Sequence, residues 1–128
     1  MNKAAQLVEV LTRKELTIGS VESFTGGLFA KVITDVSGAS KCFKGSLVTY
    51  SKETKVNLLG IDPDFIDTYG MVSSGVSQQM AIKGRKLLNV DICCETPLET
   101  IPYLSIKSPS MPSKFSLASF EYVTNDPL

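Results

Sequence analysis

Strand-like and helix-like segments alternate along residues 3–94, and this alternation constrains the fold more than any other feature of the sequence. Three short segments rich in β-branched residues favour strands. They are residues 16–23, 45–51 and 90–94. Between and before them, apolar residues or helix-capping residues indicate helices. The predicted helices cover residues 3–14, 28–36, 52–59, 63–69 and 73–88. Such alternation is typical of an α/β fold.

The composition excludes several function classes. The chain has 128 residues, the usual size of one domain that can bury its own core. It has no histidine, which excludes Ser-His-Asp and Cys-His nucleophile systems and histidine-ligated metal sites. A hydroxyl nucleophile would therefore need a lysine, tyrosine, carboxylate or terminal amine as its base. Equal numbers of basic and acidic residues, 13 of each, argue against a nucleic-acid partner.

The cysteines and the N-terminal residues bear on location. The chain has an odd number of cysteines, namely Cys42, Cys93 and Cys94. Their spacing is not that of a disulfide framework or a metal site. Buried thiols in a reducing cytoplasm are the expected state. Residues 1–15 carry charges within their apolar stretch, unlike a signal peptide, and no long apolar run predicts a membrane span. We expect a cytoplasmic protein without a membrane partner.

The first candidate site is the sequence Ser23-Phe24-Thr25-Gly26-Gly27, between a predicted strand and a predicted helix. Such a junction offers backbone N–H groups at a positive helix end, which suits a phosphate or an oxyanion. Two glycines allow a ligand to approach the backbone closely. On this motif alone, a tight turn with a capping hydroxyl is the favoured reading, because short glycine motifs occur often by chance.

The second candidate site follows the strand at residues 45–51. Tyr50 lies at the predicted strand end, and Lys55 lies about one turn into the next helix. A partly desolvated lysine loses its proton more easily and can serve as a general base. Ser23, Lys55 and Tyr50 could therefore form a nucleophile, a base and a relay. The alternative is a solvent-exposed helix that carries Lys52, Glu53 and Lys55.

Longer motifs resemble a known family. The segments VESFTGGLFAKVITDVSGAS, FKGSLVTYSKETKVNLLGI, YGMVS and QMAIKG occur in this order. They are similar to the C-terminal domain of the CinA competence/damage-inducible proteins, which are nicotinamide-nucleotide amidohydrolases. The family pattern is ESxTGG, then FxGxxVTYSxExK, then GxVS. The match covers about residues 3–92.

The resemblance implies a three-layer α/β/α sandwich that hydrolyses nicotinamide mononucleotide to nicotinic acid mononucleotide and ammonia. It implies Ser23, Tyr50 and Lys55 as catalytic residues. Substrate contacts are then expected near Thr25 and the two glycines that follow it, Gly26 and Gly27. No metal or other cofactor is expected, and homo-oligomerisation is an open possibility.

The sequence departs from the family pattern near residue 94. The family continues with a glycine-rich SGxAGPxGG loop that contributes to the substrate pocket. Here the chain reads CCETPLETIPYLSIKSPSMP, which contains no glycine. We therefore expect a partial amidohydrolase domain at 1–94, a divergent tail at 95–128 and a sandwich incomplete at its C-terminal end. A reading-frame change, a truncation and extreme divergence each explain this. The alternative function is an impaired remnant that at most binds a pyridine nucleotide.

Overall fold

The computed structural model describes residues 2–96, 103–107 and 122–125, and for the last of these only the backbone. It contains one mixed sheet with the strand order β2-β1-β3-β4-β5. The strands are β1 (Ile18–Glu22), β2 (Phe43–Val48), β3 (Ile92–Glu95), β4 (Tyr103–Ile106) and β5 (Tyr122–Asn125). β1 pairs in parallel with β2 and β3, β3 pairs antiparallel with β4, and β4 pairs in parallel with β5.

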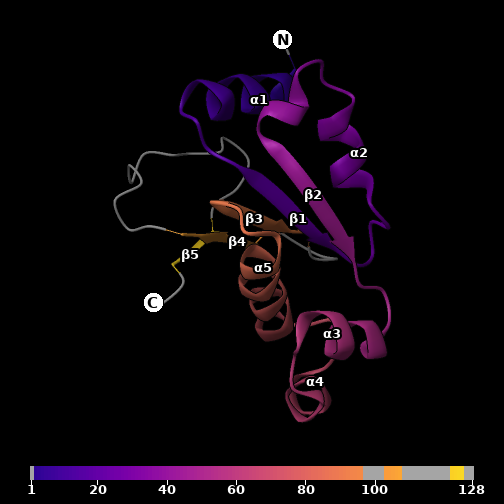
Figure 1. The fold of residues 1–128 in the computed structure, drawn as a ribbon. Coiled ribbons are helices and arrows are strands. Elements are labelled where there is room, and N and C mark those ends of the chain that lie inside the picture. The colour runs from indigo at the N-terminus through magenta and orange to yellow at the C-terminus, as the bar shows by residue number, and fades with distance from the viewer. Residues whose placement is uncertain (1, 97–102, 108–121, 126–128) are drawn as a thin grey trace.

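Helices cover both faces of the sheet, which confirms the predicted three-layer α/β/α arrangement (Figure 1). One face carries α1 (Lys3–Arg13), α2 (Leu28–Thr34) and the short 3-10 helix η1 (Ala39–Lys41). The other face carries α5 (Ser74–Leu88), with α3 (Lys52–Leu59) and α4 (Pro63–Tyr69) beyond it. Two apolar cores result, one on each side of the sheet.

Strand β1 lies at the centre of both cores. Its side chains alternate between the faces, so Ile18 packs with α1 and α2 while Val21 packs with α5. All five residues of β1 are buried, as expected for a parallel strand covered on both faces. Gly84 brings α5 close to the sheet, because a Cβ atom added there would lie 2.0 Å from Cγ2 of Val21. The centre of the fold is therefore tightly packed.

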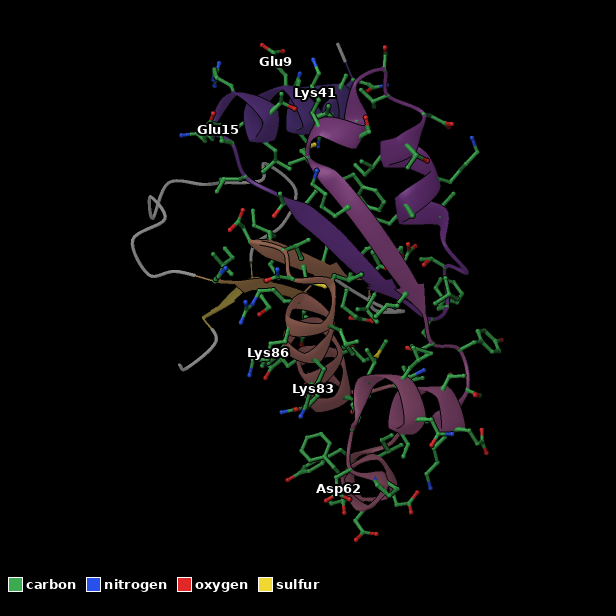
Figure 2. The ribbon with its side chains drawn as sticks, viewed as in Figure 1. Glu9, Glu15, Lys41, Asp62, Lys83 and Lys86 are labelled. Carbon is green, nitrogen blue, oxygen red and sulfur yellow. The ribbon has the colours of Figure 1, made fainter. Side chains whose placement is uncertain are left out.

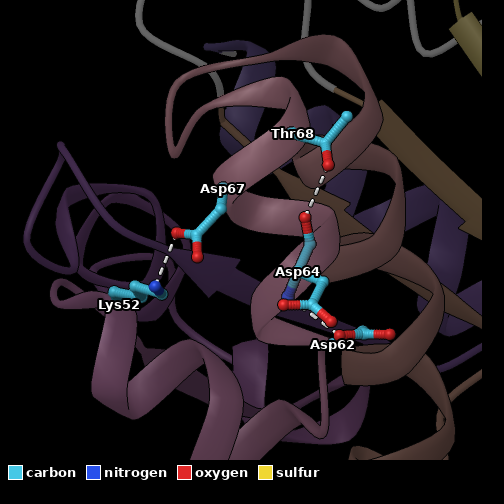
Figure 3. A network of polar contacts seen from close by, with 5 residues as sticks. All are labelled: Lys52, Asp62, Asp64, Asp67 and Thr68. Carbon is cyan, nitrogen blue, oxygen red and sulfur yellow. Dashed lines mark hydrogen bonds and ion pairs between the residues drawn. The ribbon is translucent and has the colours of Figure 1, made fainter.

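Capping residues define the ends of α3 and the start of α4. The Ser51 side chain caps α3 by accepting from the Thr54 amide, and Gly60 ends the helix in a left-handed conformation. In α4, Asp62 is the N-cap and Pro63 the first helical residue. Figure 3 shows the Asp62 side chain accepting from the Asp64 amide at 2.9 Å, and the ion pair between Lys52 and Asp67 at 2.6 Å that joins α3 to α4.

Several details differ from the predictions. β2 begins at Phe43 and ends at Val48, so it starts and ends earlier than the predicted strand at 45–51. Ser51 does not belong to the strand and is the N-cap of α3. α2 ends at Thr34, before the predicted stop, and Leu28 and Val32 of its apolar stripe are exposed. β4 lies in the segment that the sequence analysis treats as a divergent tail, and no strand was predicted at its position. None of the helices in the described part of the chain has the length and apolar composition of a membrane span.

Candidate active site

The candidate site lies where β1 and β2 end at the same edge of the sheet. Ser23 directly follows β1, and the loop after β2 leads into α3, which carries Lys55. Val48 of β2 is the register partner of Glu22 of β1, so the two strands end side by side. The carboxyl ends of parallel strands are the usual location of sites in open α/β sheets. This topology brings Ser23 and Lys55 together although 32 positions separate them.

Lys55 is the most unusual residue of the site, because its side chain is 1% exposed. Its Nζ donates to the Ser23 hydroxyl at 3.0 Å and to the Tyr50 carbonyl at 3.3 Å. It also donates to the Thr49 carbonyl. Burial lowers the pKa of Lys55, and the nearby Glu95 carboxylate partly opposes this shift. The geometry therefore holds an amine of lowered basicity against a half-buried serine hydroxyl.

This pair can carry out nucleophilic chemistry without histidine. A neutral Lys55 amine can accept the Ser23 proton as the hydroxyl attacks a carbonyl carbon. The hydrogen bond of 3.0 Å lies within the reach that proton transfer requires. Ser23 is half-buried, whereas Lys55 is fully buried.

The carboxylate of Glu22 fixes the turn that carries Ser23. It accepts hydrogen bonds from the Thr25 hydroxyl at 2.7 Å and from the amides of Phe29 and Ala30 at 2.8 and 3.1 Å. Burial acts to raise the pKa of Glu22, but these hydrogen bonds and one from Ser20 outweigh it and leave the pKa lowered. An ionised Glu22 therefore caps the first turn of α2 from inside the protein.

The turn residues Thr25, Gly26 and Gly27 lie beside the pair. Gly26 and Gly27 have φ values of +64° and +109°, a conformation that favours glycine. The Gly26 amide donates to the Ser23 carbonyl, so it is already used. The amides of Thr25 and Gly27 donate to no residue within the described ranges. Of the three predicted ligand-binding positions, two therefore offer a backbone donor.

Tyr50 contributes to the site through its backbone. Its carbonyl accepts from Lys55, but its side chain is 71% exposed. No hydrogen bond joins the phenol to any side chain that the structure describes. The structure thus brings Ser23 and Lys55 together and leaves the phenol of Tyr50 outside the contact.

Glu95 is a member of this region that the sequence analysis did not identify. It ends β3, it is 2% exposed, and Ser77 of α5 acts on its carboxyl group to favour the charged form. Burial raises the pKa of Glu95 to about 7, against the opposing effects of Ser77 and Lys55. The next residue, Thr96, has its hydroxyl 3.3 Å from that of Thr25. The sequence feature that could have identified Glu95 is a carboxylate directly after the predicted strand at 90–94.

Apart from the candidate active site, the described part of the chain has a further cavity and no metal cluster. Among the described residues, His, Cys, Asp and Glu form no cluster of three or more that could hold a metal ion. A surface cavity of about 470 Å³ lies between α1 and η1, lined in part by Glu9 and Lys41 (Figure 2). Neither Ser23 nor Lys55 lines it. The cavity is therefore separate from the candidate active site.

Comparisons with curated proteins agree with the motifs. A CinA-like protein of Prochlorococcus marinus (strain MIT 9515) is 51% identical over 83 residues, which are 65% of this chain and 19% of that protein. A CinA-like protein of Chlorobaculum tepidum is 48% identical over 75 residues, which are 59% of this chain and 18% of that protein. The chain thus spans about a fifth of the length of the curated relatives it matches.

Solved structures and the family model lead to the same family. The crystal structure of the competence/damage inducible protein CihA from Agrobacterium tumefaciens matches with a TM-score of 0.71 and 28% identity. The match covers 73% of this chain and 56% of that chain. The family model described as the CinA C-terminal domain matches residues 1–96. With residues 1–96 of 128 matched, the chain belongs to the CinA C-terminal domain family.

Proposed function

We propose that this chain hydrolyses the carboxamide of nicotinamide mononucleotide, giving nicotinic acid mononucleotide and ammonia. The observation that carries the proposal is the 3.0 Å hydrogen bond between Nζ of Lys55 and Oγ of Ser23. A buried lysine in contact with a serine hydroxyl is an arrangement that can activate the nucleophile of an amidase without histidine. The substrate class comes from the resemblance of the ESFTGG and VTYSKETK segments to the family pattern.

The proposed reaction uses Ser23 as nucleophile and Lys55 as base. Oγ of Ser23 bonds to the amide carbon while its proton moves to the neutral amine of Lys55. Lys55 passes this proton to the amide nitrogen, the C–N bond breaks, and ammonia leaves an ester on Ser23. Water then attacks the ester and gives a proton to Lys55. That proton returns to Oγ of Ser23 as the acid departs.

The turn after β1 supplies the second requirement, a place for the developing negative charge. The amides of Thr25 and Gly27 are candidates to hold the oxyanion, since neither donates to a described residue. The Glu22 hydrogen bonds to Thr25 and Phe29 keep this turn in place. We assign Tyr50 to the site through its carbonyl, which helps to hold Lys55. A catalytic role of its phenol requires the exposed ring to turn inward.

Two further properties belong to this proposal. The three cysteines are free and buried, which supports the cytoplasm as the compartment. Phe24, Leu28 and Val48 are exposed near the edge strand β2, which supports homo-oligomerisation. Light scattering after size-exclusion chromatography tests the oligomeric state directly.

The second candidate function is binding of a pyridine nucleotide without turnover. Two observations favour it: the exposed ring of Tyr50, and Glu95 and Thr96 in place of the start of the family's glycine-rich loop. Such a protein would be stabilised by the mononucleotide and release no ammonia. Thermal unfolding with and without the ligand detects this binding.

Ammonia release from nicotinamide mononucleotide tests the proposed function. The Ser23→Ala variant should lose at least about 10³-fold in rate, because the nucleophile is absent. Ser40→Ala, an exposed serine on η1, is the matched control and should retain the native rate. Release that persists in Ser23→Ala excludes the serine mechanism. A folded native chain that binds the ligand without releasing ammonia favours the binding function.

A further inference from the structure

We propose that Glu95 is a positioning residue that controls, by electrostatic attraction, whether Lys55 carries a proton. This inference rests on the amidase function proposed above, in which Lys55 must be neutral to accept the Ser23 proton. The sequence resemblance gives Glu95 no role, because it lies where the chain leaves the family pattern. The argument therefore rests on the placement and surroundings of its carboxyl group.

The sheet places Glu95 on the same side as Lys55. Glu95 is the register partner of Val21, two residues before Ser23. It lies two residues after Cys93, so both side chains face the α5 layer. Ser77 of α5 and Lys55 of α3 both act on the carboxyl group and favour its charged form. Glu95 thus places a carboxyl group, at the end of β3, where its charge acts on Lys55, the base of the proposed reaction.

The carboxyl group of Glu95 is buried with one of its oxygens lacking a hydrogen-bond partner in the described part of the chain. Oε2 of Glu95 is buried and has no hydrogen-bond partner among the described residues. A buried carboxylate oxygen without a partner is costly, so the group is easily protonated unless a cation is near. Lys55 is the cation that acts on it. This arrangement makes the charge of each group depend on the charge of the other.

The two pKa shifts agree with this dependence. Burial raises the pKa of Glu95 to about 7, and Lys55 opposes the rise. Burial lowers the pKa of Lys55, and Glu95 opposes the fall. Each charged group therefore stabilises the charged form of the other. Removing the negative charge of Glu95 must lower the pKa of Lys55 further.

Other groups near Glu95 do not replace Lys55 in this role. Burial raises the pKa of Cys93 to about 12 and that of Cys94 well above its ordinary value, so both thiols stay neutral near pH 7. Other titratable or charged groups on the elements packed around Glu95 include Arg85 on α5, which acts on Cys93, Glu22 on β1, which acts on Cys94, and Tyr103, the register partner on β4.

The Glu95→Gln variant separates charge from shape. Glutamine keeps the size of the side chain and an acceptor for Ser77, but it carries no charge. Glu53→Gln is the matched control, because it removes the same charge from an exposed position of α3, the helix that carries Lys55. We expect the Lys55 pKa to fall by roughly one unit in Glu95→Gln and to stay within about 0.2 units in Glu53→Gln.

The measurement is a pH titration of the ¹³Cε resonance of Lys55 in protein labelled with ¹³C-lysine, assigned by its loss in Lys55→Met. It needs neither substrate nor turnover. An unchanged Lys55 midpoint in Glu95→Gln overturns the inference. Should this variant not fold, the ¹³Cδ resonance of Glu95 decides: a midpoint that rises in Lys55→Met relative to the native chain supports the inference, and an unchanged midpoint overturns it.

The pH dependence of the kinetics provides a second test of the inference. The acid limb of kcat/KM for ammonia release should move to lower pH by the same roughly one unit in Glu95→Gln, because Lys55 becomes neutral at lower pH. An acid limb that stays in place while turnover is normal overturns the role of Glu95. A native chain that releases no ammonia but shows the NMR shift contradicts the proposed function, while the control of Lys55 by Glu95 stands.

Discussion

The carboxylate of Glu22 accepts the amide hydrogen of Phe29 at 2.8 Å, which ties the last residue of β1 to the first turn of α2. Ser23 and the turn through Gly27 lie between these two residues. The same carboxylate accepts from Ser46 of β2 at 3.1 Å. One buried side chain therefore connects the central strand, the edge strand and the helix that border the candidate active site.

Replacing Glu22 by glutamine should destabilise the protein by about 2–4 kcal/mol. Each carboxylate oxygen accepts from at least two donors, and the amide nitrogen of glutamine cannot accept, so at least two donors lose their acceptor. The charge that favours the helix N-terminus is also lost. Urea unfolding at pH 7 measures the change. Glu9→Gln on the outer side of α1 (Figure 2) is the control and should change stability by less than about 0.5 kcal/mol.

The lowered pKa of Glu22 adds a pH dependence. Its folded-state pKa lies below the unfolded value of 4.5, so its contribution is complete above that pH and is lost as the pH falls through the folded value. The stability difference between native protein and Glu22→Gln should therefore shrink below pH 4.5. A difference that stays constant down to pH 3 would contradict an ionised Glu22 in the fold.

Gly84→Ala should destabilise the protein by about 1–3 kcal/mol, because the new methyl group would lie 2.0 Å from Val21 and 3.2 Å from Sγ of Cys93. The helix must then move away from the sheet. Gly75→Ala in the same helix meets only the Phe65 ring at 3.2 Å and gains helix propensity, so we expect a change within about 1 kcal/mol. Thermal unfolding compares the two. Equal effects would argue against the close packing of α5 on β1.

Glu95 predicts a pH dependence of the opposite sign to that of Glu22. Its folded-state pKa of about 7 lies above the unfolded value of 4.5, so between these values the folded protein binds more protons than the unfolded chain. The free energy of unfolding should fall as the pH rises through this window, by up to about 3 kcal/mol. In Glu95→Gln this decline should disappear. Urea midpoints measured from pH 4.5 to 8 test it, and an unchanged decline would assign it to other groups.

Local patterns predicted the fold as far as β3. Ser51, Asp62 and Pro63 mark helix starts by their own chemistry, and the β-branched residues of β1 favour a strand wherever they lie. β4 could not be predicted in this way, because prolines at positions 102 and 109 flank a short segment with no clear period. Its strand conformation comes from pairing with β3, which is a tertiary contact.

The same distinction applies to the site. The ESFTGG and VTYSKETK segments singled out Ser23 and Lys55, and the parallel strand ends explain why they meet. The orientation of the Tyr50 ring depends on how the loop leaves β2, which a motif does not specify. Glu95 depends on burial beneath α5, and only the assembled sheet shows that its carboxyl group lies near Lys55.

The role of Tyr50 can be tested by removing only its hydroxyl group. Because its carbonyl holds Lys55 and its ring is exposed, Tyr50→Phe should keep ammonia release within about threefold of the native rate. Steady-state kinetics at pH 7 and 8 measures this. A loss of about 100-fold or more would instead indicate that the phenol turns inward and assists Lys55, as the family resemblance implies.

Lys55 offers the most direct test of base catalysis, because two replacements separate its charge from its basicity. Lys55→Met removes both, and Lys55→Arg keeps a cation that does not lose its proton near neutral pH. If Lys55 accepts the Ser23 proton, both variants should lose at least about 100-fold in ammonia release. Lys52→Arg in the same helix keeps the ion pair with Asp67 and should retain the native rate. Circular dichroism checks that each variant is folded. Activity that survives in a folded Lys55→Arg variant would mean that Lys55 acts through its charge alone, and another group would have to be the base.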